Sequence, residues 1–404
     1  MFQSISPAPP DAIFGLNEAM RRDDRPGKIN LGAGVYKDES GQTPILGVVK
    51  AAEKRLLDEE ATKSYLPIDG HPAYAERVRR LVFGGEHAAL KDERIATVHS
   101  PGGTGALRVV AELLRTVGAA AGKIPTIWLS SPTWANHPKI FAAAGLETKT
   151  YAYYDAAKRD LDLDGMLSSL EAVQAGDVVV LHGCCHNPTG VDPSPEAWTE
   201  IAELVAKRGA VPLVDFAYHG FVHGLDEDAA VVRRMAEQAE EMIVCTSFSK
   251  NFGLYAERVG AAHLLTGSAE QTRALLSRAK ICVRTNYSNP PVHGAAVVAT
   301  VLGDEGLTAT WHDELAAMRG RIQDMRQALA DGLDGRGVHL HDEGNGFVVR
   351  QNGMFSFSGL TPEEVERLQA EHAVYILKSG RINVAGITPT NLDQLCDAIA
   401  AVRA

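Results

Sequence analysis

Short runs of β-branched and other apolar residues alternate with amphipathic stretches through the middle of the chain. Apolar runs of this kind, bounded by turn residues, predict buried strands. The stretch after Ser194 predicts a helix, because Pro195 suits a first turn and Trp198, Ile201 and Val205 share one face. The predicted strands are 126–130, 178–182, 211–215, 243–246 and 260–265. This alternation predicts an α/β fold whose mostly parallel sheet is covered by helices on both faces.

The C-terminal part of the chain predicts a second, smaller α+β domain. A long helix is predicted from apolar residues at steps of three and four, namely Leu315, Met318, Ile322, Met325, Leu329 and Leu333. Thr361 and Glu364 are spaced as a capping box, and the last helix should begin at about Asn391. The segment up to about Pro44 shows little periodicity, so we expect it to pack against other elements. We therefore predict a large domain at 45–318 and a small domain, with an N-terminal arm, from 1–44 and 319–404.

Composition excludes several classes of protein. The chain has 404 residues, 45% of them apolar, and a net charge of −11 that argues against nucleic-acid binding. No window approaches the roughly 18 consecutive apolar residues of a membrane span. Residues 1–10 lack a basic region and an apolar run, so we expect no signal peptide and a cytoplasmic protein. The five cysteines lack CxxC spacing and are expected to be reduced thiols.

Lys250 is the strongest candidate for a catalytic group. It follows a predicted buried strand, where loss of water lowers the pKa of a lysine and prepares its amine to form a Schiff base. Ser247, Ser249 and Arg258 offer donors suited to a phosphate dianion. Ser247 and Lys250 also match the Ser-x-x-Lys motif of penicillin-binding hydrolases, but Ser-Asp-Asn and Lys-Thr-Gly are absent. A surface lysine in a polar loop is the remaining alternative.

Gly102, Gly103 and Thr104 precede an amphipathic helix. Glycines at a helix entry let backbone N–H groups approach an anion. The segment matches neither the dinucleotide fingerprint nor a P-loop. An ordinary loop-to-helix turn explains it equally well.

Asp215 and Tyr218 lie at and beyond the end of another predicted strand. Ligands of parallel sheets bind beyond the carboxyl ends of the strands, so both side chains can reach one ligand. A carboxylate at this position suits a pyridine nitrogen that must stay protonated. The alternative is an aspartate that caps the next turn.

His182, Cys184, Cys185 and His186 suggest a metal site at first sight. Adjacent cysteines cannot readily join both histidines around one tetrahedral ion, so we expect no metal. Asn187, before a proline, instead predicts a turn that presents its amide as a donor, with a cis peptide bond as one option.

Arg284 and Arg381 each lie in a distinctive polar or apolar setting. A guanidinium binds a carboxylate through two parallel hydrogen bonds, so two such arginines could recognise the two ends of a dicarboxylate. Each could equally form a surface ion pair.

Together these segments resemble the class I aminotransferases of the aspartate/aromatic group. The resemblance covers nearly the whole chain, from residues 30–36 to residues 381–386, and is most specific at 185–190 and 247–251. It implies the type I pyridoxal-phosphate transferase fold, in which a large domain with a mostly parallel sheet accompanies a smaller α+β domain. It also implies a homodimer whose two active sites are shared between the subunits.

The resemblance also implies roles for individual residues. Lys250 would bond to pyridoxal 5'-phosphate and move the substrate proton, and Asp215, supported by His137, would pair with the ring nitrogen. The other implied cofactor contacts are Gly103, Thr104, Trp134, Asn187, Tyr218, Ser247, Ser249, Arg258 and the partner subunit's Tyr65. The implied substrate contacts are Gly34, Trp134, Asn187, Arg284 and Arg381. Of the two arginines, Arg381 would bind the α-carboxylate, and Arg284 would reach across the dimer to the distal carboxylate. Ser288 and Asn289 lie on the same segment as Arg284.

Four residues resemble the aspartate branch of the group: Lys37, Thr43, Thr104 and Asn289. Ala33 stands where a larger aliphatic residue is common, which predicts extra room, and Ser64 also departs from the usual choice. The implied activity is ping-pong amino transfer from L-aspartate to 2-oxoglutarate, giving oxaloacetate and L-glutamate; aromatic amino acid transamination is the alternative. A non-catalytic binding protein of this fold would usually lack the lysine or the carboxylate, and this chain has both.

Overall fold

The computed structural model describes residues 2–7 and 12–404 and divides the chain into two compact units. One unit is Pro44–Gly320, and the other combines Met1–Thr43 with Arg321–Ala404. The division falls inside helix α12 (Glu305–Asp334), the long helix expected from the apolar pattern. Residues 1–10, for which no signal peptide was expected, lie partly outside the described residues.

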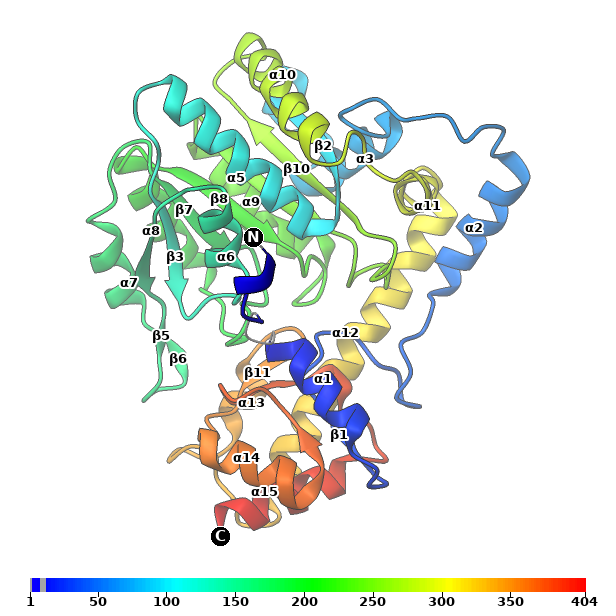
Figure 1. The fold of residues 1–404 in the computed structure, drawn as a ribbon, viewed down its shortest axis with the longest axis vertical. Coiled ribbons are helices and arrows are strands. Elements are labelled where there is room, and N and C mark those ends of the chain that lie inside the picture. Colours follow the sequence, from blue (N-terminus) through cyan, green and yellow to red (C-terminus); the bar gives the residue numbers. More distant parts are fainter. Residues whose placement is uncertain (1, 8–11) are drawn as a thin grey trace. The chain divides into compact units, whose positions relative to one another are not determined.

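A seven-stranded sheet forms the centre of the Pro44–Gly320 unit (Figure 1). Its strands lie in the order β2-β10-β9-β8-β7-β3-β4, and only β10 runs antiparallel to its neighbours. The mostly parallel sheet predicted from the sequence is therefore confirmed. The strands are β2 (Ile95–Pro101), β3 (Ile127–Ser131), β4 (Thr148–Ala152), β7 (Val178–His182), β8 (Val211–Phe216), β9 (Met242–Ser247) and β10 (Val259–Leu265); β5 (Tyr154–Asp155) and β6 (Asp160–Leu161) pair separately.

Alternate residues of the strands face two different cores. On β7, Val178 and Val180 join a cluster with α5, α6 and α10, whereas Val179 and Leu181 are buried on the opposite face. On that second face α9 packs against both α3 and α8. The helices are α2 (Gly47–Glu59), α3 (Pro72–Phe83), α4 (Ala88–Lys91), α5 (Gly102–Ala120), α6 (His137–Ala143), α7 (Leu163–Leu170), α8 (Pro195–Lys207), α9 (Leu225–Gln238), α10 (Ala269–Asn286) and α11 (His293–Leu302).

Predicted helix starts are confirmed where a side chain caps the first turn. Ser194 accepts a hydrogen bond from the Ala197 N–H at the start of α8. Thr361 and Glu364 form the expected capping box at the start of α14 (Pro362–His372). These caps satisfy N–H groups that have no partner within the helix.

The second unit contains helices that the sequence did not predict, among them one near the N-terminus. Helix α1 (Ala12–Arg22) lies in the segment for which little periodicity was recognised. It is short and contains Gly15, so its local propensity is weak and tertiary contacts stabilise it; for example, Asn30 donates to Asn17 over 2.8 Å. The other elements are η1 (Phe2–Ser4), β1 (Ile29–Asn30), α13 (Gly346–Arg350), β11 (Phe355–Phe357), β12 (Val374–Tyr375), β13 (Arg381–Asn383), η2 (Val384–Gly386) and α15 (Leu392–Arg403).

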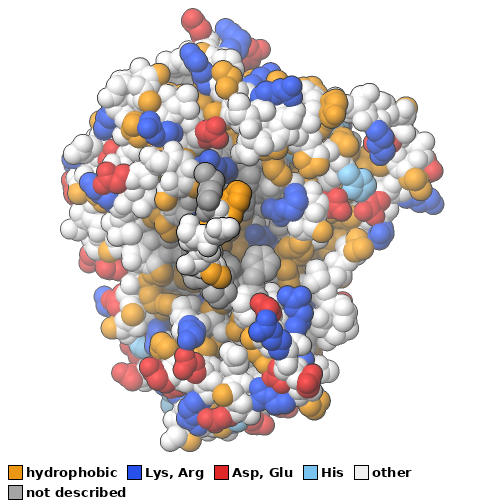
Figure 2. Space-filling model, in the orientation of Figure 1, with side chains coloured by type: hydrophobic (Ala, Val, Ile, Leu, Met, Phe, Trp, Pro, Cys, Tyr) orange, Lys and Arg blue, Asp and Glu red, His pale blue; other side chains and the backbone are white. Residues whose placement is uncertain are grey.

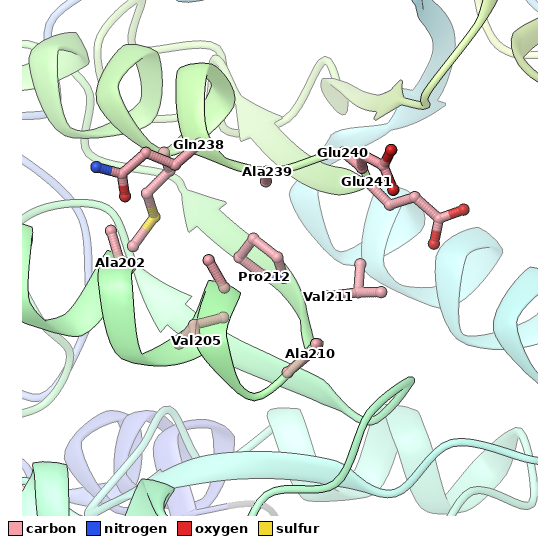
Figure 3. Close-up of a pocket in the computed structure, with 12 residues that line it drawn as sticks. Ala202, Val205, Ala210, Val211, Pro212, Gln238, Ala239, Glu240 and Glu241 are labelled. Atoms are coloured by element: carbon pink, nitrogen blue, oxygen red, sulfur yellow. The ribbon is translucent and has the colours of Figure 1, made fainter.

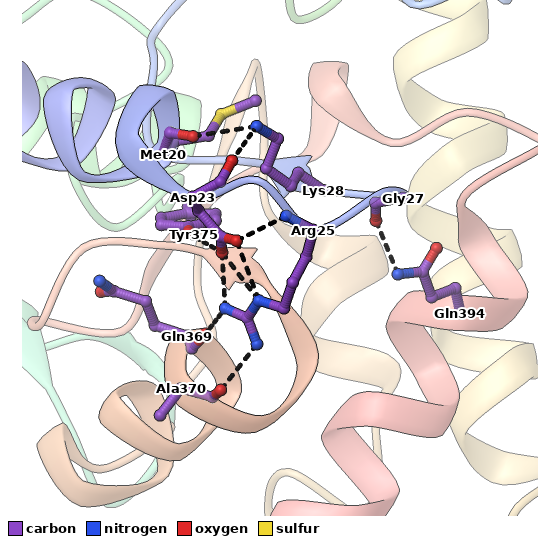
Figure 4. Close-up of polar contacts among 9 residues, drawn as sticks. All are labelled: Met20, Asp23, Arg25, Gly27, Lys28, Gln369, Ala370, Tyr375 and Gln394. Atoms are coloured by element: carbon purple, nitrogen blue, oxygen red, sulfur yellow. Dashed lines mark hydrogen bonds and ion pairs between the residues drawn. The ribbon is translucent and has the colours of Figure 1, made fainter.

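The N-terminal segment packs on C-terminal helices, as expected (Figure 4). Arg25 donates to the Gln369 and Ala370 carbonyls in the last turn of α14, at 2.8 and 2.7 Å. Helix carbonyls at that end lack intrahelical partners, and a cation there also favours the helix dipole. Tyr375 donates to Asp23, which in turn accepts from Arg25. Residues far apart in the sequence are thus joined into one unit.

The surface and the cysteines add little chemistry. Side chains of both charges are interspersed on the face in Figure 2. All five cysteines are buried free thiols. Within the described residues, no helix is long and apolar enough to cross a membrane.

Arg326 is a fully buried arginine of the second unit. Its guanidinium donates to the carbonyls of Val348, Gly353 and Phe355 at 2.8, 2.7 and 2.6 Å. Buried carbonyl groups that lose a partner are costly. Arg326 therefore fixes the irregular backbone that leads into β11.

We expect Arg326→Met to lower the free energy of unfolding by about 3 kcal/mol or more, because several buried carbonyls lose their donor. Denaturant titration would measure the change. Arg350→Met makes the same replacement at an exposed position of the same unit and should have little effect. Equal losses in the two variants would contradict the role assigned to Arg326.

Candidate active site

Lys250, Asp215 and Tyr218 meet beyond the carboxyl ends of β8 and β9. The two strands are parallel neighbours, with Asp215 paired to Cys245, so the residues after each strand emerge at the same edge of the sheet. The Lys250 Nζ lies 4.9 Å from the centre of the Tyr218 ring. The sequence predicted these three residues separately, and the structure places them together.

The environment of Lys250 prepares its amine to react. Burial lowers its pKa from the ordinary 10.5 to about 8. The nearby carboxylate of Asp215 opposes this shift, and the cation of Arg258 adds to it. Near neutral pH, a far larger fraction of this amine than of an ordinary lysine is therefore neutral and nucleophilic, while the ammonium form still predominates.

Asp215 remains ionised although it is buried. Burial opposes its charge, but the hydrogen bond with His137 and the neighbouring charges outweigh it, so its pKa lies below the ordinary value. His137 Nε2 lies 3.0 Å from Asp215 Oδ2, and its Nδ1 lies 2.8 Å from the Thr133 hydroxyl. Thr133 in turn lies 3.2 Å from His182 Nε2. A hydrogen-bonded chain thus fixes the carboxylate from behind.

Backbone hydrogen bonds hold the segment that carries Asn187. The Asn187–Pro188 peptide bond is cis, one of the options that the sequence left open. Asp192 accepts from the backbone N–H groups of Cys185 and His186, at 2.8 and 2.9 Å. These bonds hold the turn on which the buried Asn187 lies. Among the described residues, no group of His, Cys, Asp or Glu is arranged to bind a metal ion.

Donors suited to an anion converge where β2 leads into α5. Gly102 adopts a positive φ of 77°, and a Cβ there would lie only 2.3 Å from the Arg258 guanidinium. Arg258 donates to the Ser249 hydroxyl over 3.3 Å, and Ser247 lies 3.2 Å from the same hydroxyl. The glycine thus leaves room for the arginine beside the N-terminus of α5. Two hydroxyls, a guanidinium and helix N–H groups fit a phosphate dianion, so this site fits pyridoxal phosphate.

Arg381 lies in the second unit and is 3% exposed. Its guanidinium donates to the Gly32 carbonyl over 2.6 Å, and its Cζ lies 4.2 Å from the centre of the Phe355 ring. A Cβ on Gly34 would come within 3.0 Å of the same ring. The two substrate residues predicted in this unit, Gly34 and Arg381, therefore lie around one aromatic ring.

Three other predicted residues are less enclosed. Trp134 is half-buried, with its ring edge-on to His137 at 5.2 Å. Tyr65 is 92% exposed, and Arg284 is also exposed and donates to Ser288. In the single chain, Tyr65 and Arg284 are surface residues rather than parts of the buried site.

Thr133 and His182 contact the site through His137 but were not predicted as site residues. A signal for His182 was present, because it is the last residue of β7 and pairs in register with Asp215, the next-to-last residue of β8. Thr133 carries no such signal, since its place beside His137 depends on the turn after β3. The structure therefore differs most from the site predicted from the sequence in the hydrogen-bonded residues that support Asp215 through His137.

A hollow of about 270 Å³ lies at the opposite, amino end of β8 (Figure 3). Val205, Pro212 and Met235 line it, together with Glu240 and Glu241 at its rim. None of the predicted site residues takes part, and the polar residues at the carboxyl edge remain the candidate site.

The pKa of Lys250 can be tested in the cofactor-free protein. Only the neutral amine reacts with an acylating reagent, so its modification should rise with pH and reach half its maximum near pH 8. Asp215→Asn should move this midpoint lower, because the carboxylate favours the ammonium form. Peptide mass mapping would measure the rate. A midpoint that is the same in the folded and the denatured protein would contradict the burial argument.

Comparisons with known proteins agree with this site. The family model for aminotransferase class I and II matches residues 26–399. The chain is 52% identical to the aspartate aminotransferase of Escherichia coli (strain K12), with 100% of each covered. It is 45% identical to the aromatic-amino-acid aminotransferase of Pseudomonas aeruginosa, covering 99% of this chain and 98% of the relative.

The fold comparison gives the same result. The aromatic-amino-acid aminotransferase from Burkholderia pseudomallei, solved covalently bound to pyridoxal phosphate, matches with a TM-score of 0.96 and 44% identity, and 100% of each chain is covered. The similarity extends over both units, as the motifs had indicated. The chain belongs to the class I and II aminotransferase family.

Proposed function

We propose that this protein is an aspartate aminotransferase that uses pyridoxal 5'-phosphate to transfer the amino group of L-aspartate to 2-oxoglutarate. The observation that carries the proposal is the buried amine of Lys250, whose lowered pKa lets it lose its proton. It lies between Asp215 and the groups at the start of α5 that can donate hydrogen bonds to a phosphate. The full-length identity of 52% to an aspartate aminotransferase supports the choice of substrate. The products would be oxaloacetate and L-glutamate, formed with ping-pong kinetics.

The chain's own residues would divide the chemistry among them. When bound, pyridoxal phosphate supplies a ring that delocalises the electrons of the broken Cα–H bond. Lys250 Nζ would take the proton from the substrate Cα as a general base and later return it as a general acid. Asp215 would keep the pyridine nitrogen protonated, while Tyr218 and Asn187 would donate to the phenolic oxygen.

Further groups would hold the cofactor and the substrate. Trp134 would lie against the cofactor ring. The phosphate would be bound by Gly103, Thr104, Ser247, Ser249, Arg258 and the partner subunit's Tyr65. Arg381 would bind the α-carboxylate, near the Gly34 backbone, because its fixed guanidinium can offer two parallel hydrogen bonds. Arg284 would bind the distal carboxylate of the substrate.

We also propose a cytoplasmic homodimer with shared sites, in which Pro44–Gly320 binds the cofactor and the other unit is the small domain. The exposure of Tyr65 and Arg284 supports this, since both are proposed to act across the dimer. Ile45 and Leu57, before and within α2, are also exposed, at 60% and 83%. A subunit interface would remove such apolar side chains from water.

Aromatic amino acid transamination is the second candidate. It is favoured by the relatives with that activity and by the small side chain of Ala33 in the segment that contacts Arg381. Both candidates would use Lys250 and Arg381, and of the two amino donors only aspartate has a second carboxylate that needs a cation. Dual specificity would combine the two.

The catalytic role of Lys250 gives the most direct test. Borohydride treatment of the holoenzyme should fix the cofactor covalently on Lys250, as peptide mass mapping would show. Lys250→Ala should lower kcat by at least about a hundredfold, the lower range for loss of a general base. Exposed Lys54 offers a matched control, because Lys54→Ala should leave kcat unchanged. A colourless protein, or normal transamination by Lys250→Ala, would refute the proposal.

The role of Arg284 can be tested by changing the substrate. Arg284→Leu should lower kcat/KM for aspartate by about a hundredfold or more, because the distal carboxylate loses its cation. It should leave kcat/KM for phenylalanine nearly unchanged. An equal effect on both substrates would contradict the assignment.

Hybrid dimers test whether the sites are shared. Mixing Lys250→Ala with Arg284→Leu chains should restore aspartate turnover, because one site of each hybrid combines an intact Lys250 with an intact Arg284 from the partner. Mixed subunits with no gain over the separate variants would show that Arg284 acts within its own chain.

A further inference from the structure

Residues 31–35, here called the N-terminal strap, run beside β13 without forming a strand of their own. Four of the strap carbonyls accept hydrogen bonds from only two residues of β13. The Asn383 backbone N–H donates to Leu31 over 2.7 Å, and Arg381 donates to Gly32 over 2.6 Å. The side-chain amide of Asn383 donates to both Ala33 and Val35, at 2.7 Å each.

Asn383 is therefore the main attachment of the strap. It is 1% exposed, so no water competes for its amide protons. Its backbone also pairs with Phe355 in the β11–β13 ladder. One residue thus connects the strap to the strand that carries the ring beside Arg381.

The strap and Phe355 together fix the Arg381 guanidinium. The Gly32 carbonyl accepts one of its N–H groups, and the Phe355 ring lies 4.2 Å from its Cζ. Gly34 also approaches this ring, since a Cβ there would lie 3.0 Å from it. A shift of the strap would therefore rotate the guanidinium, and a two-point bond to a carboxylate tolerates little rotation.

We propose that Asn383 is a positioning residue for binding the substrate α-carboxylate, acting through the strap and Arg381. This inference rests on the proposed function, in which Arg381 binds that carboxylate. Every amino acid and 2-oxo acid substrate has an α-carboxylate. Loss of Asn383 would therefore weaken binding of aspartate and of an aromatic substrate alike, in contrast to loss of Arg284.

A matched pair of variants tests the proposal in the holoenzyme. Asn383→Ala removes two amide hydrogen bonds at a buried site. Asn345→Ala removes two amide donors and one acceptor elsewhere in the unit, because Asn345 is 1% exposed, donates to Asp334 and Val338 at 2.7 Å each and accepts from the Leu340 N–H over 2.8 Å. Asn383→Asp keeps the shape of the side chain but removes the donors. Thermal denaturation of each variant would establish that it is folded.

We expect Asn383→Ala and Asn383→Asp to raise KM for aspartate and phenylalanine by about tenfold to a hundredfold. Their kcat should change by less than about threefold, since Lys250 is untouched. The dissociation constant of succinate, a dicarboxylate without an amine, should rise in parallel with KM in a calorimetric titration. Asn345→Ala should lower the melting temperature with KM unchanged.

Several outcomes would overturn the proposal. Equal changes of KM in the Asn383 and Asn345 variants would show a merely structural role, and so would an unchanged KM in Asn383→Ala. Additive losses in the double variant Asn383→Ala with Arg381→Lys would show that Asn383 does not act through Arg381. Asn383→Ser, which retains one donor, carries the same test if Asn383→Ala does not fold. Failure of the proposed function is distinct, because the unsubstituted holoenzyme would then neither transaminate aspartate nor bind succinate.

Discussion

An amine and a carboxylate withdrawn from water at the same edge of a sheet influence each other strongly, and the active site depends on this pair. Burial disfavours the charged form of both Lys250 and Asp215. The hydrogen bond with His137 keeps Asp215 ionised, while the amine of Lys250 retains a pKa of about 8. The two groups therefore differ in protonation near neutral pH, which is the condition for one to move a proton and the other to hold a cation.

The sheet explains why this pair can be buried at all. The β8 and β9 strands are parallel and enclosed on both faces, so their carboxyl ends converge on a rigid, partly dry edge. Glycine at the start of α5 brings Arg258 and helix N–H groups to the same edge. The charge on Asp215 is thus balanced by fixed groups, and the charge on a cofactor phosphate would be balanced in the same way by the donors beside α5.

In the second unit, the arginine proposed to bind a carboxylate is held by a hydrogen bond and by an aromatic ring. There the Arg381 guanidinium is held by a backbone carbonyl and an aromatic ring, and the strap that supplies the carbonyl is attached through Asn383. The distal carboxylate is assigned instead to Arg284, which is exposed in the single chain. Affinity for all substrates and preference for a dicarboxylate would therefore be set by separate residues.

The sequence by itself determined the α/β class, five strands of the seven-stranded sheet to within one residue, the caps at Ser194 and Thr361, and the family. These properties follow from local patterns, because strand burial, helix capping and motif chemistry involve residues close together in the chain. The residue types at Lys250, Asp215 and Arg381 were equally evident. Helix α1 was missed because tertiary contacts, rather than propensity, stabilise it.

Only the tertiary structure decided which of these residues meet. Three features depend on contacts between segments that are distant in sequence. They are the antiparallel pairing of β10, the hydrogen bonds from Asp215 through His137 to Thr133, and the contact of Asn383 with the strap. No periodicity encodes such pairs, because each depends on how buried carbonyls and side chains find partners once the elements have packed. The sequence specified the chemical groups, and packing determined their partners.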